Sequence, residues 1–542
     1  MAQANNIFPL PGVQHGKRII ASVIEARAER DTETPWASLP IDEHNLSLGF
    51  RDLSFRDLNN AANHAAHWLR HNLPQTSELF QRFAYAGPKD LRWPILAVAA
   101  AKLQKVLILP SPLVTAEAQR RILEKENCTV YLRPLATKAQ VDAILHNAPQ
   151  VQILDCPDLT EFLQEKEADP VKYGKTWDEG KDDPWMVFHT SGTTGNPKPV
   201  TYTHRMIASI DIIAASPNIK QSIVHMVANN RLYTPLPSIH VTGMLLTLST
   251  TTYVNMTAVF GPSTPPTLDI ILSIFNNTTV HGTLLPPVLI DALCLSEDGL
   301  AALCRLKFLM YAGAPLAAKS AALLTPHVQL INGVGTTEAG GFFTAMHKHQ
   351  DAWEYLSFAQ QPGVTFEPRT SDGLHELVFV RDPDLDSGSD DLPQVFLVYP
   401  ELTRFETKDL WRPHPVYKDL WKIVGRTDDY VVMSHGDGLH ASSLEPEIAA
   451  HPAVKAALIS GHGRAKPALI VELVPGTQGF EVQSLKPYID KVNAQCHECV
   501  RLDMERVIVA SEEKPFKYTD KGSVIRMQTS QLYEEDIEAL ER

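Results

Sequence analysis

One stretch rich in Ser, Thr and Gly constrains this chain more than any other: residues 188–200, which read FHTSGTTGNPKPV. Glycines allow backbone N–H groups to turn onto a phosphate, and hydroxyls add further donors. A lysine supplies positive charge, and a proline on each side of it restricts the loop. The spacing is not that of a Walker loop. The alternatives are a phosphate-binding loop and a polar surface loop. The residues predicted to bind phosphate are Thr190, Ser191, Gly192, Thr193, Thr194, Gly195 and Lys198.

Length and charge limit the class of protein. A chain of 542 residues is too long for one hydrophobic core, so two or more domains are expected. The net charge of −14 argues against a nucleic-acid partner, which requires a basic face. Six cysteines do not form a disulfide framework, which favours a reducing, cytoplasmic location. The most apolar run, 93–114, contains two lysines and two prolines, so it predicts a buried helix and a strand, with no membrane partner.

Hydrophobic periodicity predicts an α/β fold. Residues 54–69 have helical spacing with Ser54 as the N-cap, and helical and short apolar segments then alternate up to residue 132. This alternation is typical of βαβ units with parallel strands, and it resumes with a strand at 308–311. We expect a domain boundary near residue 425. It divides the chain into an N-terminal core, 1–425, and a smaller α+β domain, 426–542.

A second glycine-rich segment, 332–338, reads NGVGTTE. By itself it could be a turn before a helix. Together with residues 188–200 it resembles the adenylate-forming superfamily, which includes acyl-CoA synthetases, luciferases and peptide-synthetase adenylation domains. The resemblance implies a large domain of stacked mixed βαβ sheets with a distorted barrel, followed by a small mobile C-terminal domain. It also implies that ATP and Mg²⁺ are the cofactors.

The resemblance assigns roles to this second segment. Asn332 would bind the adenine edge, Val334 would replace the usual aromatic residue against the purine, and Thr337 would contact the α-phosphate. Glu338 would hold Mg²⁺, a hard cation that prefers carboxylate oxygen. A small-residue turn at 311–316 would lie along the adenine. The remaining nucleotide-lining residues implied by these two segments are Gly313, Ala314, Pro315, Gly333, Gly335 and Thr336.

Residues 407–409 (TKD), 419–421 (DLW) and 425–426 (GR) follow in the family's order. The resemblance implies that Asp409 accepts hydrogen bonds from the ribose hydroxyls. It also implies that Trp421 and Arg426 belong to the nucleotide site and that Asp428 is the hinge. A single Asp or Arg is usually a solvated charge, so these assignments depend on chain order and spacing.

Residues 236–240 (LPSIH), followed by Val241-Thr242-Gly243, indicate the substrate class. Amino-acid-activating domains usually carry an Asp here, whereas this pattern resembles acyl- and aryl-acid activators. His240 would lie near the carboxylate of an acid without an α-amino group, with a benzoic-type acid expected. The acid-lining residues implied by the resemblance are His240, Val241, Gly243, Ala312, Gly313 and Gly335.

The C-terminal motifs narrow the resemblance. The loop at 434–437 (SHGD) and residues 521–526 (KGSVIR) resemble the adenylation domain of fungal peptide-synthetase-like carboxylic acid reductases, from about Ile20 to Arg526. Ser523 stands where most members have the catalytic lysine, so Lys521 is the first candidate for that role and Lys517 the second. Residues 532–542 are expected to form the first helix of a carrier domain, cut short. The chain is then either an excised domain or a stand-alone relative.

The expected reaction has two steps. ATP and the acid give acyl-AMP and pyrophosphate, and the acyl group then passes to the phosphopantetheine thiol of a carrier domain absent from this chain, for reduction by a reductase domain. Catalysis would involve Lys521, His240, Thr337 and Glu338. The alternatives are a free-standing aryl- or acyl-CoA ligase and a non-catalytic nucleotide-binding homologue. The Cys496-His497-Glu498-Cys499 segment lacks a second ligand pair, so no zinc site is expected.

Overall fold

The chain forms two compact units. In the first are Met1–Thr190, Pro197–Pro362 and Pro383–Glu401, and in the second are Gly363–Asp382 and Leu402–Arg542. The structure, a computed structural model, describes residues 8–31, 33–111, 116–190, 198–216, 219, 221–313, 315–341, 344–358, 363–369, 373–385, 389–434, 437–518 and 522–541, without the side chain of Asp428.

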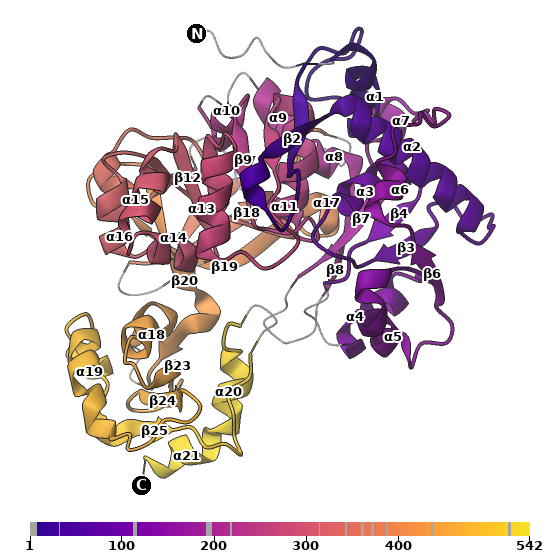
Figure 1. The fold of residues 1–542 in the computed structure, drawn as a ribbon. Coiled ribbons are helices and arrows are strands. Elements are labelled where there is room, and N and C mark those ends of the chain that lie inside the picture. Colours follow the sequence, from indigo (N-terminus) through magenta and orange to yellow (C-terminus); the bar gives the residue numbers. More distant parts are fainter. Residues whose placement is uncertain are drawn as a thin grey trace. The chain divides into compact units, whose positions relative to one another are not determined.

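The first unit contains a six-stranded sheet with the order β6-β5-β3-β4-β7-β8 (Figure 1). All neighbouring strands are parallel except β7 and β8, which form an antiparallel pair. The strands are β3 (Arg82–Tyr85), β4 (Val106–Ile108), β5 (Val130–Pro134), β6 (Gln152–Cys156), β7 (Pro184–His189) and β8 (Pro199–Thr203). The connecting helices are α2 (Phe55–Asn72), α3 (Arg92–Lys102), α4 (Ala116–Lys125) and α5 (Lys138–Leu145).

A second sheet of this unit has seven strands in the order β13-β12-β11-β9-β10-β1-β2. Only β2 is antiparallel to its neighbour. The strands are β1 (Pro35–Pro40), β2 (Phe50–Ser54), β9 (Arg231–Tyr233), β10 (Thr257–Val259), β11 (Gly282–Leu285), β12 (Phe308–Ala312) and β13 (Gln329–Gly333). Figure 1 shows helices beside β12, namely α13 (Leu268–Asn277), α14 (Pro287–Leu293), α15 (Glu297–Cys304) and α16 (Ala318–Leu324).

Local sequence explains these elements. Ser54 and Asp57 form a capping box, which satisfies backbone donors at the start of α2. The apolar run at 93–114 forms the buried helix α3 and the strand β4 that its sequence predicts. No helix of the described residues is long and apolar enough to cross a bilayer. Further helices of this unit are α1 (Ile20–Arg30), α6 (Leu159–Phe162), α7 (Trp177–Gly180), α8 (His204–Ile207), α9 (Ser209–Ala215), α10 (Ile223–Val227), α12 (Thr250–Val254) and α17 (Val395–Val398).

The second unit begins with an antiparallel arrangement of β20, β19, β18 and β17, in that order. These strands are β17 (Val364–Pro368), β18 (His375–Val380), β19 (Arg404–Pro413) and β20 (Leu420–Arg426). They are followed by the pair β21 (Tyr430–Val432) and β22 (Gly438–His440), and by the sheet of β23 (Val454–Ser460), β24 (Ala468–Leu473) and β25 (Val507–Val509).

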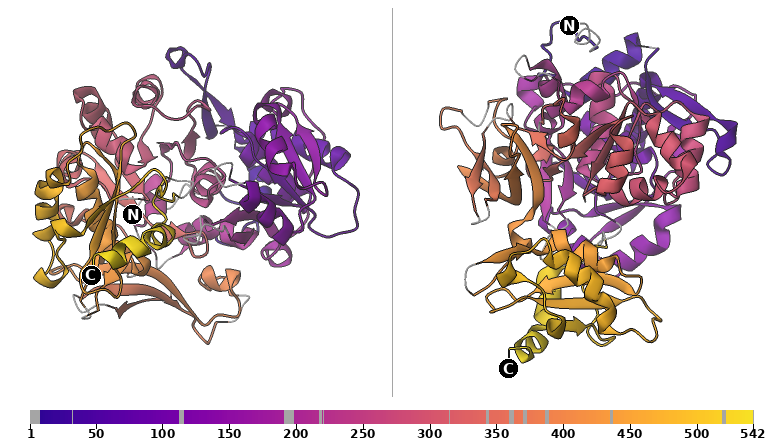
Figure 2. Two further views of the ribbon diagram at one scale, coloured as in Figure 1. Left: turned by 90° about the horizontal axis from the view of Figure 1, so that it is seen from below. Right: turned by 90° about the vertical axis from the view of Figure 1, so that its left-hand side faces the viewer.

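The two faces of the β23-β24-β25 sheet carry separate cores. Ala457 and Ile459 pack toward α18 (Ala441–Ala449) and α19 (Lys486–Asn493), whereas Leu458 packs with Tyr533 and Ile537. This alternation is the two-residue period of a strand. Figure 2 shows from two further directions the helices around this sheet, coloured orange to yellow.

The C-terminal tail corrects one expectation. Residues 532–542 were expected to begin a carrier domain, but α21 (Glu534–Ala539), which follows α20 (Arg526–Leu532), belongs to the core described above. The apolar spacing of the tail therefore reflects packing against β23 and β24. The α/β fold class is confirmed, with two mixed sheets, an antiparallel sheet and a smaller C-terminal α+β part.

Candidate functional site

The β7–β8 pair forms the neck of the predicted phosphate loop. His189 pairs with Pro199 in the antiparallel register. Beyond it, the Thr190 N–H donates to the Lys198 carbonyl at 3.0 Å, and the Lys198 N–H donates to Thr190 Oγ1 at 3.3 Å. The side chain of Lys198 is exposed. The structure therefore fixes both ends of the loop, while the predicted residues Ser191, Gly192, Thr193, Thr194 and Gly195 lie outside the described residues.

Two predicted nucleotide-binding turns lie side by side: residues 311–316 at the end of β12 and residues 332–338 at the end of β13. We call them the two glycine-rich turns. β12 and β13 are parallel neighbours, with Tyr311 opposite Asn332 and Ala312 opposite Gly333. Gly313 follows with a φ of +87°, a conformation that favours glycine. Ligands of open α/β sheets bind outside the carboxyl ends of the strands, which is where both turns begin. Of the other predicted residues here, Pro315 is exposed, Val334 is half-buried, and Ala314 lies outside the described residues.

Thr337 and Glu338 lie in a tight hairpin. Its strands are β14 (Gly335–Thr336) and β15 (Gly340–Gly341), which pair in antiparallel fashion. A Cβ atom on Gly335 would lie 2.5 Å from the Gly340 carbonyl oxygen, so only glycine fits there. The Ala339 N–H donates to Thr336 Oγ1 at 3.0 Å, which fixes the turn. The hairpin thus presents a hydroxyl and a carboxylate on a backbone with little freedom to move.

Tyr202 on β8 contacts the candidate site, and the sequence reasoning missed it. Its hydroxyl donates to the Thr337 carbonyl at 2.8 Å and accepts from Gln394 Nε2 at 2.8 Å. Burial raises the pKa of Tyr202, and the negative charge of Glu338 adds to the effect. The hydrogen bond ties the strand after the phosphate loop to the Thr337–Glu338 hairpin. A buried tyrosine hydroxyl needs a polar partner, so a tyrosine in the apolar strand after the phosphate loop is the sequence feature that indicates such a contact.

The predicted acid-binding segment is a compact turn. His240 precedes α11 (Val241–Met244), its N–H donates to the Pro237 carbonyl at 3.1 Å, and its carbonyl accepts from Met244 N–H at 2.9 Å. A Cβ on Gly243 would lie 2.2 Å from the Pro237 carbonyl oxygen. Gly243 is therefore required by close packing, whatever its contact with a substrate. A cavity of about 10 Å³ adjoins this segment and is lined by Leu232, Thr234, Leu236, Leu246, Thr247, Met256, Ala258, Val259 and Phe260.

In the second unit, Asp409 and Arg426 face each other across β19 and β20. Arg426 Nη1 donates to Asp409 Oδ1 at 3.1 Å, and Asp409 is 8% exposed. Trp421 instead stacks on Phe366, with ring centroids 3.8 Å apart. Its predicted place at a nucleotide stays a prediction. Asp428 lies in the 3₁₀ turn Thr427–Asp429 (η6), and its role as a hinge also stays a prediction.

Burial raises the pKa of Asp409 to about 6, from an ordinary value of 3.8. Arg426 opposes this shift, whereas the carboxylates of Glu376 and Asp429 add to it. A buried acid with a raised pKa costs stability when it ionises, so this position is unfavourable for folding at neutral pH.

We expect Asp409→Asn to stabilise the protein at pH 7.5 by about 2–3 kcal/mol, following the size of the pKa shift. Well below pH 3.8 the acid is protonated in both the folded and the unfolded state, so the variant gains nothing. The gain appears as the pH rises from 4 to 6. Thermal unfolding from pH 4.5 to 8 measures it. Asp52→Asn is a control of opposite sign, because hydrogen bonding to Arg231 lowers the pKa of Asp52. A less stable Asp409→Asn variant at pH 7.5 would contradict the expectation.

The C-terminal lysines differ in what the structure describes. Lys521 lies outside the described residues. Lys517 is exposed; its N–H donates to Thr529 Oγ1 at 3.1 Å, and its carbonyl accepts from Ile525 N–H at 2.7 Å.

The described residues contain no cluster of three or more His, Cys, Asp or Glu side chains suited to a metal. At the C-x-x-C segment, Cys499 Sγ lies 3.3 Å from Asp437 Oδ2.

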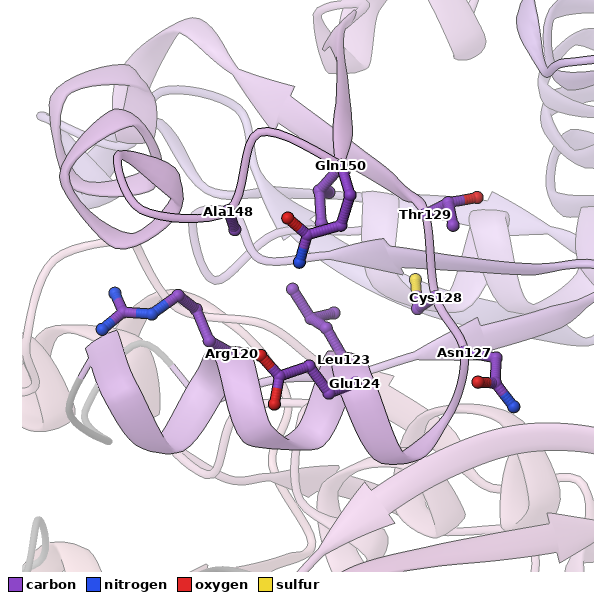
Figure 3. A pocket seen from close by; sticks show the side chains of 9 residues that line it. Arg120, Leu123, Glu124, Asn127, Cys128, Thr129, Ala148 and Gln150 are labelled. Carbon is purple, nitrogen blue, oxygen red and sulfur yellow. The ribbon is translucent and has the colours of Figure 1, made fainter.

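A separate surface pocket lies away from these residues. Figure 3 shows it between α4, which contributes Arg120, Leu123 and Glu124, and the segment before β6 with Ala148 and Gln150; its volume is about 240 Å³. It opens at the amino ends of β5 and β6. The predicted phosphate and nucleotide turns follow the carboxyl ends of β7, β12 and β13, so the pocket is not part of the candidate site.

Parallel sheets with glycine-rich turns at neighbouring carboxyl ends are typical of α/β nucleotide-binding proteins. The chain belongs to the AMP-binding enzyme family. The sequence profile of AMP-binding enzymes matches residues 33–365, and the profile of the AMP-binding enzyme C-terminal domain matches residues 428–542. Enzymes of this family use ATP.

Individual relatives agree with this assignment. The chain is 29% identical over 540 residues to a carboxylic acid reductase of Neurospora crassa, covering 97% of this chain and 51% of that protein. It thus spans about half the length of this relative. Among solved structures, ATP-bound MatB from Rhodopseudomonas palustris has a TM-score of 0.70 at 16% identity, covering 95% of this chain and 99% of that chain. The adenylation domain of a carboxylate reductase from Mycobacterium chelonae has a TM-score of 0.69 at 17% identity, and the match covers 99% of this chain and 92% of that chain. These two likenesses show the fold.

Proposed function

We propose that this protein activates a carboxylic acid with ATP, giving acyl-AMP and pyrophosphate. The observation that carries the proposal is the geometry of the first unit. The register of β12 and β13 places the two glycine-rich turns together, and Tyr202 ties the Thr337–Glu338 hairpin to the strand that leaves the phosphate loop. The residues predicted to bind the base and the phosphates are thus connected by the pairing of β12 with β13 and by the hydrogen bond of the buried Tyr202 hydroxyl.

In this proposal, an oxygen of the acid attacks the α-phosphorus of ATP and pyrophosphate leaves. Lys198 places positive charge at the neck of the phosphate loop, and the hydroxyl of Thr337 donates to the α-phosphate. Lys521 offsets charge on the attacking carboxylate, and His240 lies at the acid. Glu338 and the oxygens of its hairpin are a donor set that suits Mg²⁺. When bound, Mg²⁺ would offset negative charge on the phosphates.

We further propose that the acid has no α-amino group and is of the benzoic type, with transfer to a carrier phosphopantetheine as the second step. The L-P-S-I-H segment places no carboxylate beside His240 in the sequence to pair with an ammonium group. The carrier acceptor and a following reduction are supported by the similarity to a carboxylic acid reductase. Transfer to free CoA by the purified chain would instead support a CoA ligase.

Acid-dependent exchange of labelled pyrophosphate into ATP tests this proposal. We expect exchange with benzoic acids and none with phenylalanine or other common α-amino acids, because a buried site without a counter-charge disfavours an ammonium group. Exchange with phenylalanine and none with benzoates would refute the substrate class. ATP binding without exchange for any acid would favour a non-catalytic nucleotide-binding protein.

A further inference from the structure

Arg526 joins three elements of the second unit. Its Nη1 donates to both carboxylate oxygens of Glu445 on α18, at 2.6 Å each. Its Nη2 donates to the Ile459 carbonyl on β23 at 2.7 Å, and its Nε lies 3.5 Å from Asp429 Oδ1 in η6. Arg526 is itself the first residue of α20. All three nitrogens of one guanidinium therefore face an acceptor.

Burial makes this arrangement restrictive. The side chains of Arg526 and Glu445 are 17% and 13% exposed, and that of Asp429 is 20% exposed. Burial raises the pKa of Glu445, and the positive charge of Arg526 opposes that shift. A planar fork with fixed donors sets the angles between its partners, which a lysine ammonium does not. The contact therefore fixes orientation as well as distance.

The residues of this contact are next to the predicted hinge and to the segment that contains Lys521. Asp429 directly follows Asp428, the predicted hinge, and Arg526 directly follows the segment 517–525, which contains Lys521. The two ends of that segment are held together because Ile525 N–H donates to the Lys517 carbonyl at 2.7 Å. Tyr518 and Val524 also form an isolated antiparallel bridge.

We propose that Arg526 is a positioning residue that joins the end of the hinge turn to the base of the lysine segment. In this proposal, the contact holds Asp429 in place, so backbone rotation at the hinge is confined to the residues before Asp429. Arg526 thereby fixes the orientation of the start of α20 relative to the hinge turn. The inference rests on the proposed function to the extent that Lys521 acts in adenylation. It concerns residues outside the predicted contacts with ATP and the acid.

Two variants remove the link while keeping the fold. Asp429→Asn leaves the buried Arg526–Glu445 pair intact, so thermal stability is expected to stay near that of the wild type. Arg526→Lys keeps the charge and loses the fork. The matched control is Arg464→Lys, because Arg464 forms ion pairs with Glu534 and Glu538 on α21, outside both the hinge turn and α18.

For each of the two variants we expect kcat of adenylation to fall about 10-fold, as for a small misplacement of a catalytic group, with KM for ATP within about twofold of the wild type. The double variant should lose no more than the worse single variant, because both changes break one link. Arg464→Lys should match the wild type. Losses that multiply in the double variant, or a full rate in Asp429→Asn, would overturn the proposal.

Hydrogen exchange of peptides covering 515–530 gives a readout that needs no enzymatic activity. The amides of Lys517 and Ile525 should exchange faster in Asp429→Asn and Arg526→Lys, and at the wild-type rate in Arg464→Lys. Unchanged exchange in both variants would also overturn the proposal. If the wild type shows no acid-dependent adenylation, the proposed function fails, while the exchange data still decide whether the link exists.

Discussion

Replacing Glu338 by Gln is expected to slow adenylation about 100-fold, the loss typical of one electrostatic contact to a transition state. The substitution keeps the size of the side chain and removes its charge. The hairpin backbone is fixed by Gly335, by the Ala339–Thr336 hydrogen bond and by Tyr202, so the fold should tolerate the change. The expected defect therefore lies in Mg²⁺ use, measured as the adenylation rate over a range of Mg²⁺ concentrations.

Glu401→Gln is the matched control for this prediction. Both Glu338 and Glu401 add to the raised pKa of Tyr399, whose largest cause is burial, so both carboxylates act on the same tyrosine. Glu401 has no predicted role, and its variant should turn over like the wild type. An undiminished rate for Glu338→Gln at limiting Mg²⁺ would show that Glu338 does not hold the metal.

Lys521→Ala is expected to slow adenylation about 100- to 1,000-fold, because a positioned charge facing the reacting carboxylate and phosphate is lost. Transfer of the acyl group from pre-formed acyl-AMP to a thiol should stay nearly intact, since the resemblance implies that this lysine serves only the first step. The two half-reactions are measured separately, by pyrophosphate exchange and by thioester formation from synthetic acyl-AMP.

Lys517→Ala provides the control in the same segment. The described contacts of Lys517 are those of its backbone, which an alanine retains, and its side chain is exposed. Both half-reactions should stay near the wild-type rate. An inactive Lys517→Ala variant, or equal damage to both half-reactions in Lys521→Ala, would show that the lysine has been assigned wrongly.

The sequence predicted what local pattern determines. Ser54 and Asp57 define the start of α2 through a capping box, and the apolar run at 93–114 yields α3 and β4. Local sequence predicts each of the two glycine-rich turns, 311–316 and 332–338, independently of the other. Their adjacency depends on the order β13-β12-β11 of the sheet, which is a tertiary property that no local spacing encodes.

The contacts that sequence reasoning missed join residues far apart in the chain. Tyr202 reaches Thr337 over 135 positions of the chain, and Arg526 reaches Glu445 over 81. The tail shows the opposite error. Tyr533 and Ile537 have the spacing of a helix that could begin a new domain, yet they complete the core beneath β23 and β24. Periodicity reports that a helix has an apolar face and does not report which surface covers it.

The position of an isotope label tests the central claim, activation of a carboxylate by adenylation, most directly. The purified chain is given ATP, Mg²⁺ and benzoate carrying ¹⁸O in both carboxylate oxygens, and the acyl group is then released to hydroxylamine. If a carboxylate oxygen attacks the α-phosphorus, each AMP formed retains one ¹⁸O, and pyrophosphate retains none. Label in inorganic phosphate with ADP as the other product, or AMP without label, would contradict the account.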